Sequence, residues 1–148
     1  MQQARQQPLA HVLVVEDDDL VRKLIGTVLQ RKGYLVSFAG DAIAATQVAR
    51  RELPDLVLLD ILLPGGDGIT VLERLRSIAM LQSVPVVVMT GADSEGYKVR
   101  AYQLGASEVL EKPVGPARLL EAVESALSGV DAVGIMGLVG ALESELGV

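Results

Sequence analysis

Five short apolar runs recur along the chain, and longer stretches with helical spacing separate them. The runs cover residues 11–15, 34–38, 56–59, 85–89 and 107–110. The first, third and fourth are continuously apolar, which is typical of strands covered on both faces. The pattern therefore predicts five strands, of which at least three are buried.

The stretches between the runs indicate amphipathic helices. In the first, apolar side chains recur at i, i+3, i+4, i+7 and i+8, at Val21, Leu24, Ile25, Val28 and Leu29. Gly33 then suits the position just past a helix end, and further helices are predicted over residues 68–77, 94–104 and 116–127. Alternating strands and helices predict an α/β fold, a doubly wound parallel sheet with helices on both faces and right-handed crossovers.

Composition restricts the chemistry and the compartment. The 148 residues suit one domain, with a polar, glutamine-rich leader over residues 1–10. The absence of cysteine excludes disulfides and thiolate sites, and a single histidine, His11, excludes a multi-histidine metal site. The net charge of -6 comes without a basic stripe, and no segment resembles a signal peptide or a bilayer span. We therefore expect a cytoplasmic protein without direct nucleic acid or membrane contacts.

Polar residues follow four of the predicted strands. In a sheet of this kind ligands bind at the carboxyl ends of the strands. The residues found there are Glu16, Asp17, Asp18, Asp19, Asp60, Thr90, Glu111 and Lys112. Crowded carboxylates repel one another unless a cation neutralises them, and hard oxygen ligands favour Mg²⁺. We therefore expect Mg²⁺ at this edge, with Asp60 as a nucleophile for a phosphoryl group and with Thr90 and Lys112 beside the arriving anion.

Each of these residues also has a simpler structural explanation. An acid after a strand usually caps the next helix, and a single lysine there is usually solvated. Their coincidence at four strand ends favours a site, although Asp18 and Asp19 are assigned to capping and to solvent. His11, at the start of a strand, is expected to be partly buried or at the surface, and not to donate phosphate.

Four motifs together give the chain a family resemblance. VLVVEDD (12–18), LVLLDILLPGGDG (56–68), VVVMTGA (86–92) and EVLEKPV (108–114) resemble the receiver domain of two-component response regulators. The resemblance implies a flavodoxin-like sheet of order 2-1-3-4-5 with five helices, over residues 11–128. It also implies a phosphorelay in which a sensor histidine kinase or histidine phosphotransfer protein phosphorylates Asp60. A receiver catalyses only its own phosphorylation and dephosphorylation, and switches an output protein or domain.

The resemblance also implies a role for each site residue. Glu16, Asp17, Asp60 and the backbone carbonyl of Leu62 match the ligands of Mg²⁺. Thr90 and Lys112 match the pair that binds the phosphoryl group. Pro113 matches a position that typically follows a cis peptide bond.

The sequence departs from the family pattern in three respects, the last of which involves two residues. Glu16 replaces the more usual aspartate, which should not abolish metal binding. Val109 stands where an aromatic ring usually swings inward on switching, and valine has no ring to make that movement. Leu62 and Ala92 flank the expected phosphoryl group, and neither side chain can hydrogen-bond a water. We therefore expect the acyl phosphate to be lost slowly.

Two questions stay open at this point. The alternative function is a receiver-like docking module whose phosphorylation is vestigial, which Val109 alone favours. By resemblance, the output surface lies around residues 101–105 and Val109. Residues 129–148 form an extension that is an added helix, a homodimer contact or a linker.

Overall fold

Five parallel strands form one sheet at the centre of the protein. The computed structural model describes residues 7–91 and 95–129. The strands are β1 (His11–Val15), β2 (Leu35–Ala39), β3 (Leu56–Asp60), β4 (Val86–Thr90) and β5 (Glu108–Glu111). Their order in the sheet is β2-β1-β3-β4-β5. The predicted fold class and strand order are therefore confirmed.

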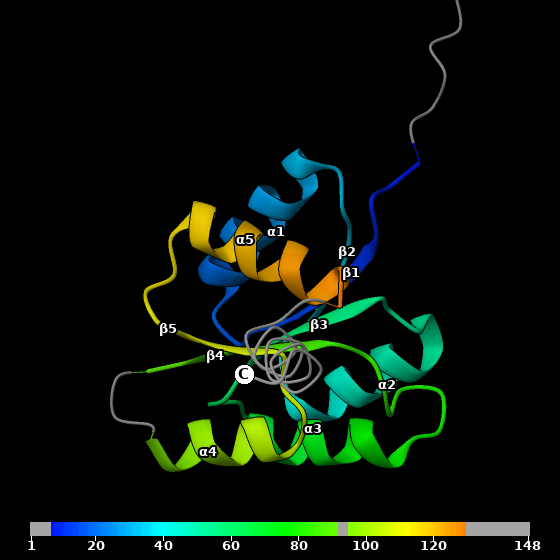
Figure 1. Cartoon of the computed structure of the whole chain (residues 1–148), viewed down its shortest axis with the longest axis vertical. Helices are drawn as coiled ribbons and strands as arrows, with labels where there is room; N and C mark the ends of the chain where they lie inside the picture. Colours follow the sequence, from blue (N-terminus) through cyan, green and yellow to red (C-terminus); the bar gives the residue numbers. More distant parts are fainter. Residues whose placement is uncertain (1–6, 92–94, 130–148) are drawn as a thin grey trace, which may run out of the picture.

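Helices cover both faces of this sheet. They are α1 (Asp19–Lys32), α2 (Ala42–Glu52), α3 (Gly68–Ser77), α4 (Glu95–Gln103) and α5 (Pro116–Leu127). Helices α1 and α5 lie on one face, and α2, α3 and α4 lie on the other (Figure 1). The predicted five helices are confirmed, including α2, for which the sequence pattern had given no bounds.

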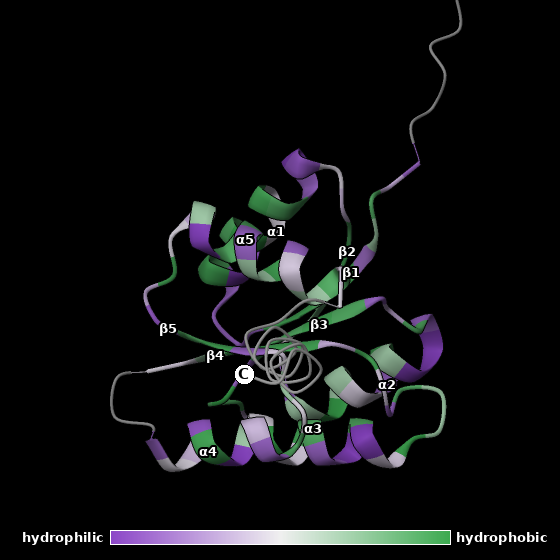
Figure 2. Ribbon diagram, in the orientation of Figure 1, coloured by the Kyte–Doolittle hydropathy of each residue, from purple (hydrophilic) through white to green (hydrophobic). Residues whose placement is uncertain are grey.

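Two apolar layers, one on each face, make up the core. Alternate residues of the central strands point to opposite faces, so Leu13, Val57 and Val88 pack under α2, α3 and α4. Their neighbours Val14, Leu58 and Val87 pack under α1 and α5. Every residue of β3 and β4 is buried, and the apolar colour of the strands contrasts with the mixed helices (Figure 2). Continuous apolar runs in the sequence therefore correspond to strands that are covered twice.

Strand bounds differ from the prediction by one residue at several places. The predicted second strand began at Tyr34, but the N–H of Tyr34 donates to the Leu29 carbonyl at the end of α1, so β2 begins at Leu35. Gly33 ends α1 in a left-handed conformation, as predicted (φ 112°). Asp60 and Thr90 were expected after their strands, but each is the last paired residue of its strand.

Helix N-termini gather at the carboxyl edge of the sheet. Asp18, Asp41 and Asp67 cap α1, α2 and α3, and each carboxylate accepts the N–H of the residue three positions on. The expected capping role of Asp18 is thereby confirmed. Capping of this kind satisfies a backbone donor that the helix leaves free. It also fixes the loops that lead out of β1, β2 and β3.

Both ends of the described chain lie at the opposite, amino edge of the sheet. His11 begins β1 there, and Leu9 donates its N–H to the Gly33 carbonyl ahead of β2. Leu127 and Gly129, at the end of α5, line a pocket with Val84 and Ser107, which precede β4 and β5. Among the residues described, no helix is both long and apolar enough to cross a membrane.

Candidate functional site

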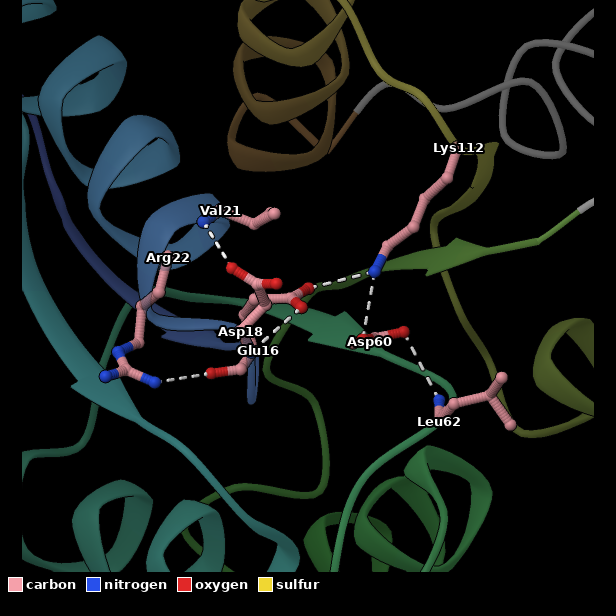
Figure 3. Close-up of polar contacts among 7 residues, drawn as sticks. All are labelled: Glu16, Asp18, Val21, Arg22, Asp60, Leu62 and Lys112. Atoms are coloured by element: carbon pink, nitrogen blue, oxygen red, sulfur yellow. Dashed lines mark hydrogen bonds and ion pairs between the residues drawn. The ribbon is translucent and has the colours of Figure 1, made fainter.

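Three strand ends bring acidic and basic side chains together. Glu16 and Asp17 follow β1, Asp60 ends β3 and Lys112 follows β5. Glu16, Asp60 and Lys112 point toward one another at the carboxyl edge (Figure 3). Glu16 and Asp60 lie side by side because β1 and β3 are neighbours in the sheet. The long Lys112 side chain reaches both acids from the end of β5.

The ammonium of Lys112 contacts two buried carboxylates. Its Nζ lies 3.0 Å from Oε2 of Glu16 and 3.0 Å from Oδ2 of Asp60. Glu16 is only 2% exposed and Asp60 only 4%. Two buried negative charges so close together require a cation, and Lys112 provides one positive charge for them.

The pKa values of Glu16 and Lys112 are both raised above their ordinary values. Burial raises the pKa of Glu16; the hydrogen bond from Lys112 opposes this shift and the negative charge of Asp60 adds to it. Burial would lower the pKa of Lys112, but hydrogen bonds to Asp60 and Glu16 and the charges of these two acids raise it instead. Lys112 is therefore held as a cation.

Glu16, Asp17 and Asp60 can together hold a metal ion. One carboxylate oxygen from each lies within 4.8 Å of the others. Three carboxylates with one exposed member, Asp17, suit Mg²⁺, which prefers oxygen ligands and keeps several waters. The donor set therefore fits the predicted ion.

Two further predicted site residues flank Asp60. The N–H of Leu62 donates to Oδ1 of Asp60 at 3.2 Å, while the residue is 65% exposed. Thr90 is buried at the end of β4, and its carbonyl accepts the N–H of Lys112 at 2.7 Å. Thr90 and Lys112 therefore share one corner of the site. Ala92 lies outside the described residues.

The loop after Asp60 turns back so tightly that it requires glycine. Gly68 donates its N–H to the Ile61 carbonyl at 2.6 Å. A Cβ at Gly68 would lie 2.8 Å from Cα of Ile61 and closer still to the Asp60 carbonyl oxygen. The start of α3 is therefore packed directly on the backbone that carries Asp60. On the other side of the site, the Lys112–Pro113 peptide bond is cis, as predicted.

Residues outside the cluster take mostly the expected positions. Asp19 is exposed and pairs with Arg22, and His11 is partly buried with Nε2 2.6 Å from the Ser37 hydroxyl. Val109 is partly buried, and its N–H donates to the Tyr102 hydroxyl at 3.3 Å. The predicted output surface needs one correction, because Ala101 is completely buried against the sheet and cannot contact a partner.

Arg22 is a residue that sequence reasoning did not select. Its Nη1 donates to the Glu16 carbonyl at 2.9 Å, directly behind the acidic residues. The sequence did contain one sign of a special role for Arg22. It is a basic residue near the start of a predicted helix, where the helix dipole disfavours positive charge.

Fold and site together define a doubly wound α/β domain with a cluster of acidic residues at the carboxyl edge of its sheet. The family model for the response regulator receiver domain matches residues 12–124. The chain belongs to this family, and is a receiver domain of two-component signalling.

Curated relatives support the same assignment over only part of their own length. The chain is 37% identical over 116 residues to the response regulator PleD of Caulobacter vibrioides, covering 78% of this chain and 26% of PleD. It is 32% identical over 124 residues to the phosphate regulon transcriptional regulatory protein PhoB of Escherichia coli, covering 84% of this chain and 54% of PhoB. The chain thus spans about a quarter to about half of these relatives.

Solved structures match at the level of the whole domain. A putative response regulator from Chloroflexus aurantiacus superposes with a TM-score of 0.78 at 33% identity, covering 82% of this chain and 99% of that one. The chemotaxis response regulator CheY4 of Vibrio cholerae gives a TM-score of 0.75 at 27% identity, covering 79% of this chain and 98% of that one.

Proposed function

We propose that Asp60 accepts a phosphoryl group from a phosphohistidine on a sensor kinase or phosphotransfer protein, and that this modification switches an interaction with an output partner or attached domain. One observation carries the proposal. The carboxylate of Asp60, at the end of a buried strand, contacts the Lys112 ammonium and lies beside two further carboxylates. Family membership supports the same role, because receiver domains are signalling domains of this kind.

The chemical step forms one bond and breaks one. A carboxylate oxygen of Asp60 bonds to phosphorus while the bond between phosphorus and the imidazole nitrogen breaks, and the nitrogen keeps the electron pair. Lys112 holds positive charge beside the transferred oxygens, and the Thr90 hydroxyl can donate to one of them. Hydrolysis later returns Asp60 to a carboxylate, so the chain is both substrate and catalyst of its own modification.

In this proposal Mg²⁺ is bound by Glu16, Asp17, Asp60 and the Leu62 carbonyl. When bound, it supplies positive charge that offsets the negative charge of the phosphoryl group. Glu16 and Asp17 hold the ion, and Asp60 is the residue that reacts. The clustering of the three carboxylates supports this arrangement.

We also propose that the phosphodonor protein, acting in the cytoplasm, docks over α1 and the start of α5. An apolar pocket of about 440 Å³ opens there, lined by Val21, Leu24, Ile25, Met89, Lys112, Pro113, Val114 and Leu119. Lys112 lines this pocket and also contacts Asp60. A phosphodonor protein that inserts an apolar side chain into the pocket would therefore be held close to Asp60.

Intact mass after incubation with Mg²⁺ and acetyl phosphate tests the proposed function. We expect the mass to rise by one phosphoryl group, the gain to be lost on chelation of the metal, and Asp60→Asn to gain nothing. Absence of any gain, repeated with a phosphohistidine protein as donor, would leave a docking module with a vestigial site.

A further inference from the structure

Arg22 reaches from the first turns of α1 to the backbone beneath the acidic residues. Its Nη1 donates to the Glu16 carbonyl at 2.9 Å, and its Nη2 pairs with Asp19 (Figure 3 shows the first contact). The side chain is only 21% exposed. A guanidinium so placed bridges the end of β1 and the start of α1 with two of its nitrogens.

The Glu16 carbonyl belongs to the peptide that joins Glu16 to Asp17, so its orientation sets where both acids point. The N–H of Glu16 is held by the Ala39 carbonyl of β2 at 3.0 Å. The Glu16 side chain is held by Lys112. The contact from Arg22 completes this set, because it fixes the carbonyl through which the exposed Asp17 is attached.

Charge and space at this point both suit an arginine. Four consecutive acids, residues 16–19, repel one another, and Arg22 pairs with the carboxylate of one of them, Asp19, while it contacts the backbone carbonyl of Glu16. Its guanidinium fills the space behind Gly40, where a Cβ would lie 3.2 Å from Nη1. A cation near a helix N-terminus works against the helix dipole. The i,i+3 pair with Asp19 offsets part of that cost within α1, but it does not account for the contact with the Glu16 carbonyl, which lies outside the helix.

We propose that Arg22 is a positioning residue for the metal-ligand pair Glu16 and Asp17. The inference rests on the proposed Mg²⁺ site and adds a residue that acts through the backbone of its ligands. Groups that orient metal ligands typically contribute about tenfold or more to metal affinity. We expect a contribution at the lower end of that range, because Arg22 acts on a carbonyl and not on a ligating oxygen.

Titration of Mg²⁺ by calorimetry, with the unphosphorylated full chain, tests the role directly. Arg22→Met keeps the stem without the donors, and we expect it to weaken Mg²⁺ binding by about tenfold. Arg22→Lys keeps the charge and one donor centre, and we expect an intermediate affinity. Lys23→Met is the matched control, because Lys23 is the exposed neighbour of Arg22 on α1 and should leave the affinity unchanged.

The rate of phosphorylation by acetyl phosphate separates positioning from a general loss of structure. For Arg22→Met, the Mg²⁺ concentration at half-maximal rate should rise in parallel with the dissociation constant, while the rate at saturating Mg²⁺ stays near that of the wild type. If Arg22→Met does not fold, Arg22→Lys carries the same comparison.

Each result decides between the two proposals. Unchanged Mg²⁺ affinity in a folded Arg22 variant, alongside tight binding by the wild type, overturns the role of Arg22 and leaves the proposed function intact. A maximal rate that falls without a change in affinity overturns it as well. Failure of the wild type to bind Mg²⁺ overturns the metal site itself, and the positioning role with it.

Discussion

At the scale of single residues, the shared cation Lys112 determines how the two buried acids behave. Both Glu16 and Asp60 contact its ammonium, so each acid is paired only as long as that side chain stays in place. Removing one partner of a buried pair leaves an uncompensated charge, which is strongly destabilising. The pKa of Glu16 responds to burial, to Lys112 and to Asp60, so a pH titration that reports on Glu16 probes the whole cluster.

We expect Mg²⁺ affinity to fall on acidification earlier than exposed carboxylates would predict. Glu16 must be deprotonated to bind the ion, and burial raises its pKa above the ordinary value of 4.5, against the opposing effect of Lys112. Affinity is therefore full above the raised pKa and is lost as the pH falls through it. Calorimetric titrations over a pH series measure the midpoint.

The control for this series is Asp18→Asn, because the Asp18 side chain caps α1 and is not one of the three clustered carboxylates. The substitution keeps the backbone N–H that Asp18 donates to the Glu16 carboxylate. Its pH profile should keep the midpoint of the wild type. An observed midpoint at or below the ordinary glutamate value would contradict the prediction.

Leu62 makes a separate prediction about the lifetime of the phosphorylated state. Its backbone contacts Asp60, but its side chain has no polar atom that could orient an attacking water. We expect Leu62→Asn to shorten the lifetime by several-fold, up to about tenfold, because a polar group near the phosphoryl group can position that water. Decay of the phosphorylated mass after removal of the donor measures this rate.

Leu20→Asn makes the corresponding change at a similarly exposed position on α1. The phosphorylated form of Leu20→Asn should decay at the same rate as that of the wild type. Equal lifetimes for Leu62→Asn and the wild type would show that the residue has no such effect.

The site residues differ in how far the sequence could reveal them. Glu16, Asp17, Asp60, Thr90 and Lys112 were predicted as candidates because parallel strands bring their ends to one edge. Arg22 was not, because its contact is with a backbone carbonyl, and no pattern of residue types records which carbonyl a side chain will reach. The same is true of the contact between Tyr102 and the backbone of Val109.

At the scale of elements, the fit of α3 against β3 controls the position of Asp60. The first residue of α3, Gly68, is packed on the Asp60 carbonyl and hydrogen-bonded to Ile61. The obstacle to a side chain there is backbone, which cannot move aside as a flexible side chain can. Helix α3 and strand β3 are therefore in contact at Asp60 itself.

Gly68→Ala should destabilise the domain by about 1–3 kcal/mol, the usual cost of forcing an extra methyl group into a packed site. It should also slow phosphorylation, because the Asp60 backbone must shift. Urea unfolding and the acetyl phosphate rate measure the two effects.

Gly96→Ala provides a control with the same chemical change. A Cβ at Gly96, in α4, would meet nothing within 4 Å. It should stabilise the protein by up to about 1 kcal/mol through helix propensity, with no effect on the rate. A Gly68→Ala variant as stable and as fast as the wild type would show that the contact is not important.

Elements were predictable where apolar periodicity was strong, and less so at their ends. The bounds of α3 and α5 agree with the prediction, since an apolar stripe and clear terminal residues define both. The predicted start of β2 was wrong by one residue, because the N–H of Tyr34 donates to a carbonyl at the end of α1. The apolar pattern of the sequence does not record that hydrogen bond. Helix α2 had no predicted bounds, because its buried face consists of alanines, which give a weak apolar signal.

At the scale of the whole molecule, the two helical layers meet the site differently. The layer of α1 and α5 borders the site through the apolar pocket that includes Lys112. The layer of α2, α3 and α4 meets it through the loop after Asp60, where the Ala42 N–H of α2 donates to the Pro64 carbonyl at 3.2 Å. The apolar pocket therefore suits the docking of the proposed phosphodonor protein, and the layer of α2, α3 and α4 is hydrogen-bonded to the loop that follows Asp60.

Substitution in the pocket should separate protein donors from small ones. Leu24 is 58% exposed and lines the pocket. We expect Leu24→Ser to slow transfer from a phosphohistidine protein by about tenfold, because lost apolar contact weakens docking. Transfer from acetyl phosphate should be unchanged.

The ratio of the two rates is the measurement. Ile43→Ser, equally exposed but on α2, is the control and should change neither rate. Equal slowing with both donors would mean that Leu24 acts on the site and not on docking.

The positions of the first and last described residues have a consequence for modular use of the domain. Residues that enter β1 and leave α5 lie at the amino edge of the sheet, away from Asp60 at the carboxyl edge. A tether, label or foreign domain fused at either end of the folded unit would be attached on the side of the sheet away from Asp60. Such a fusion would therefore leave the carboxyl edge of the sheet, with Glu16, Asp60 and Lys112, open to a binding partner.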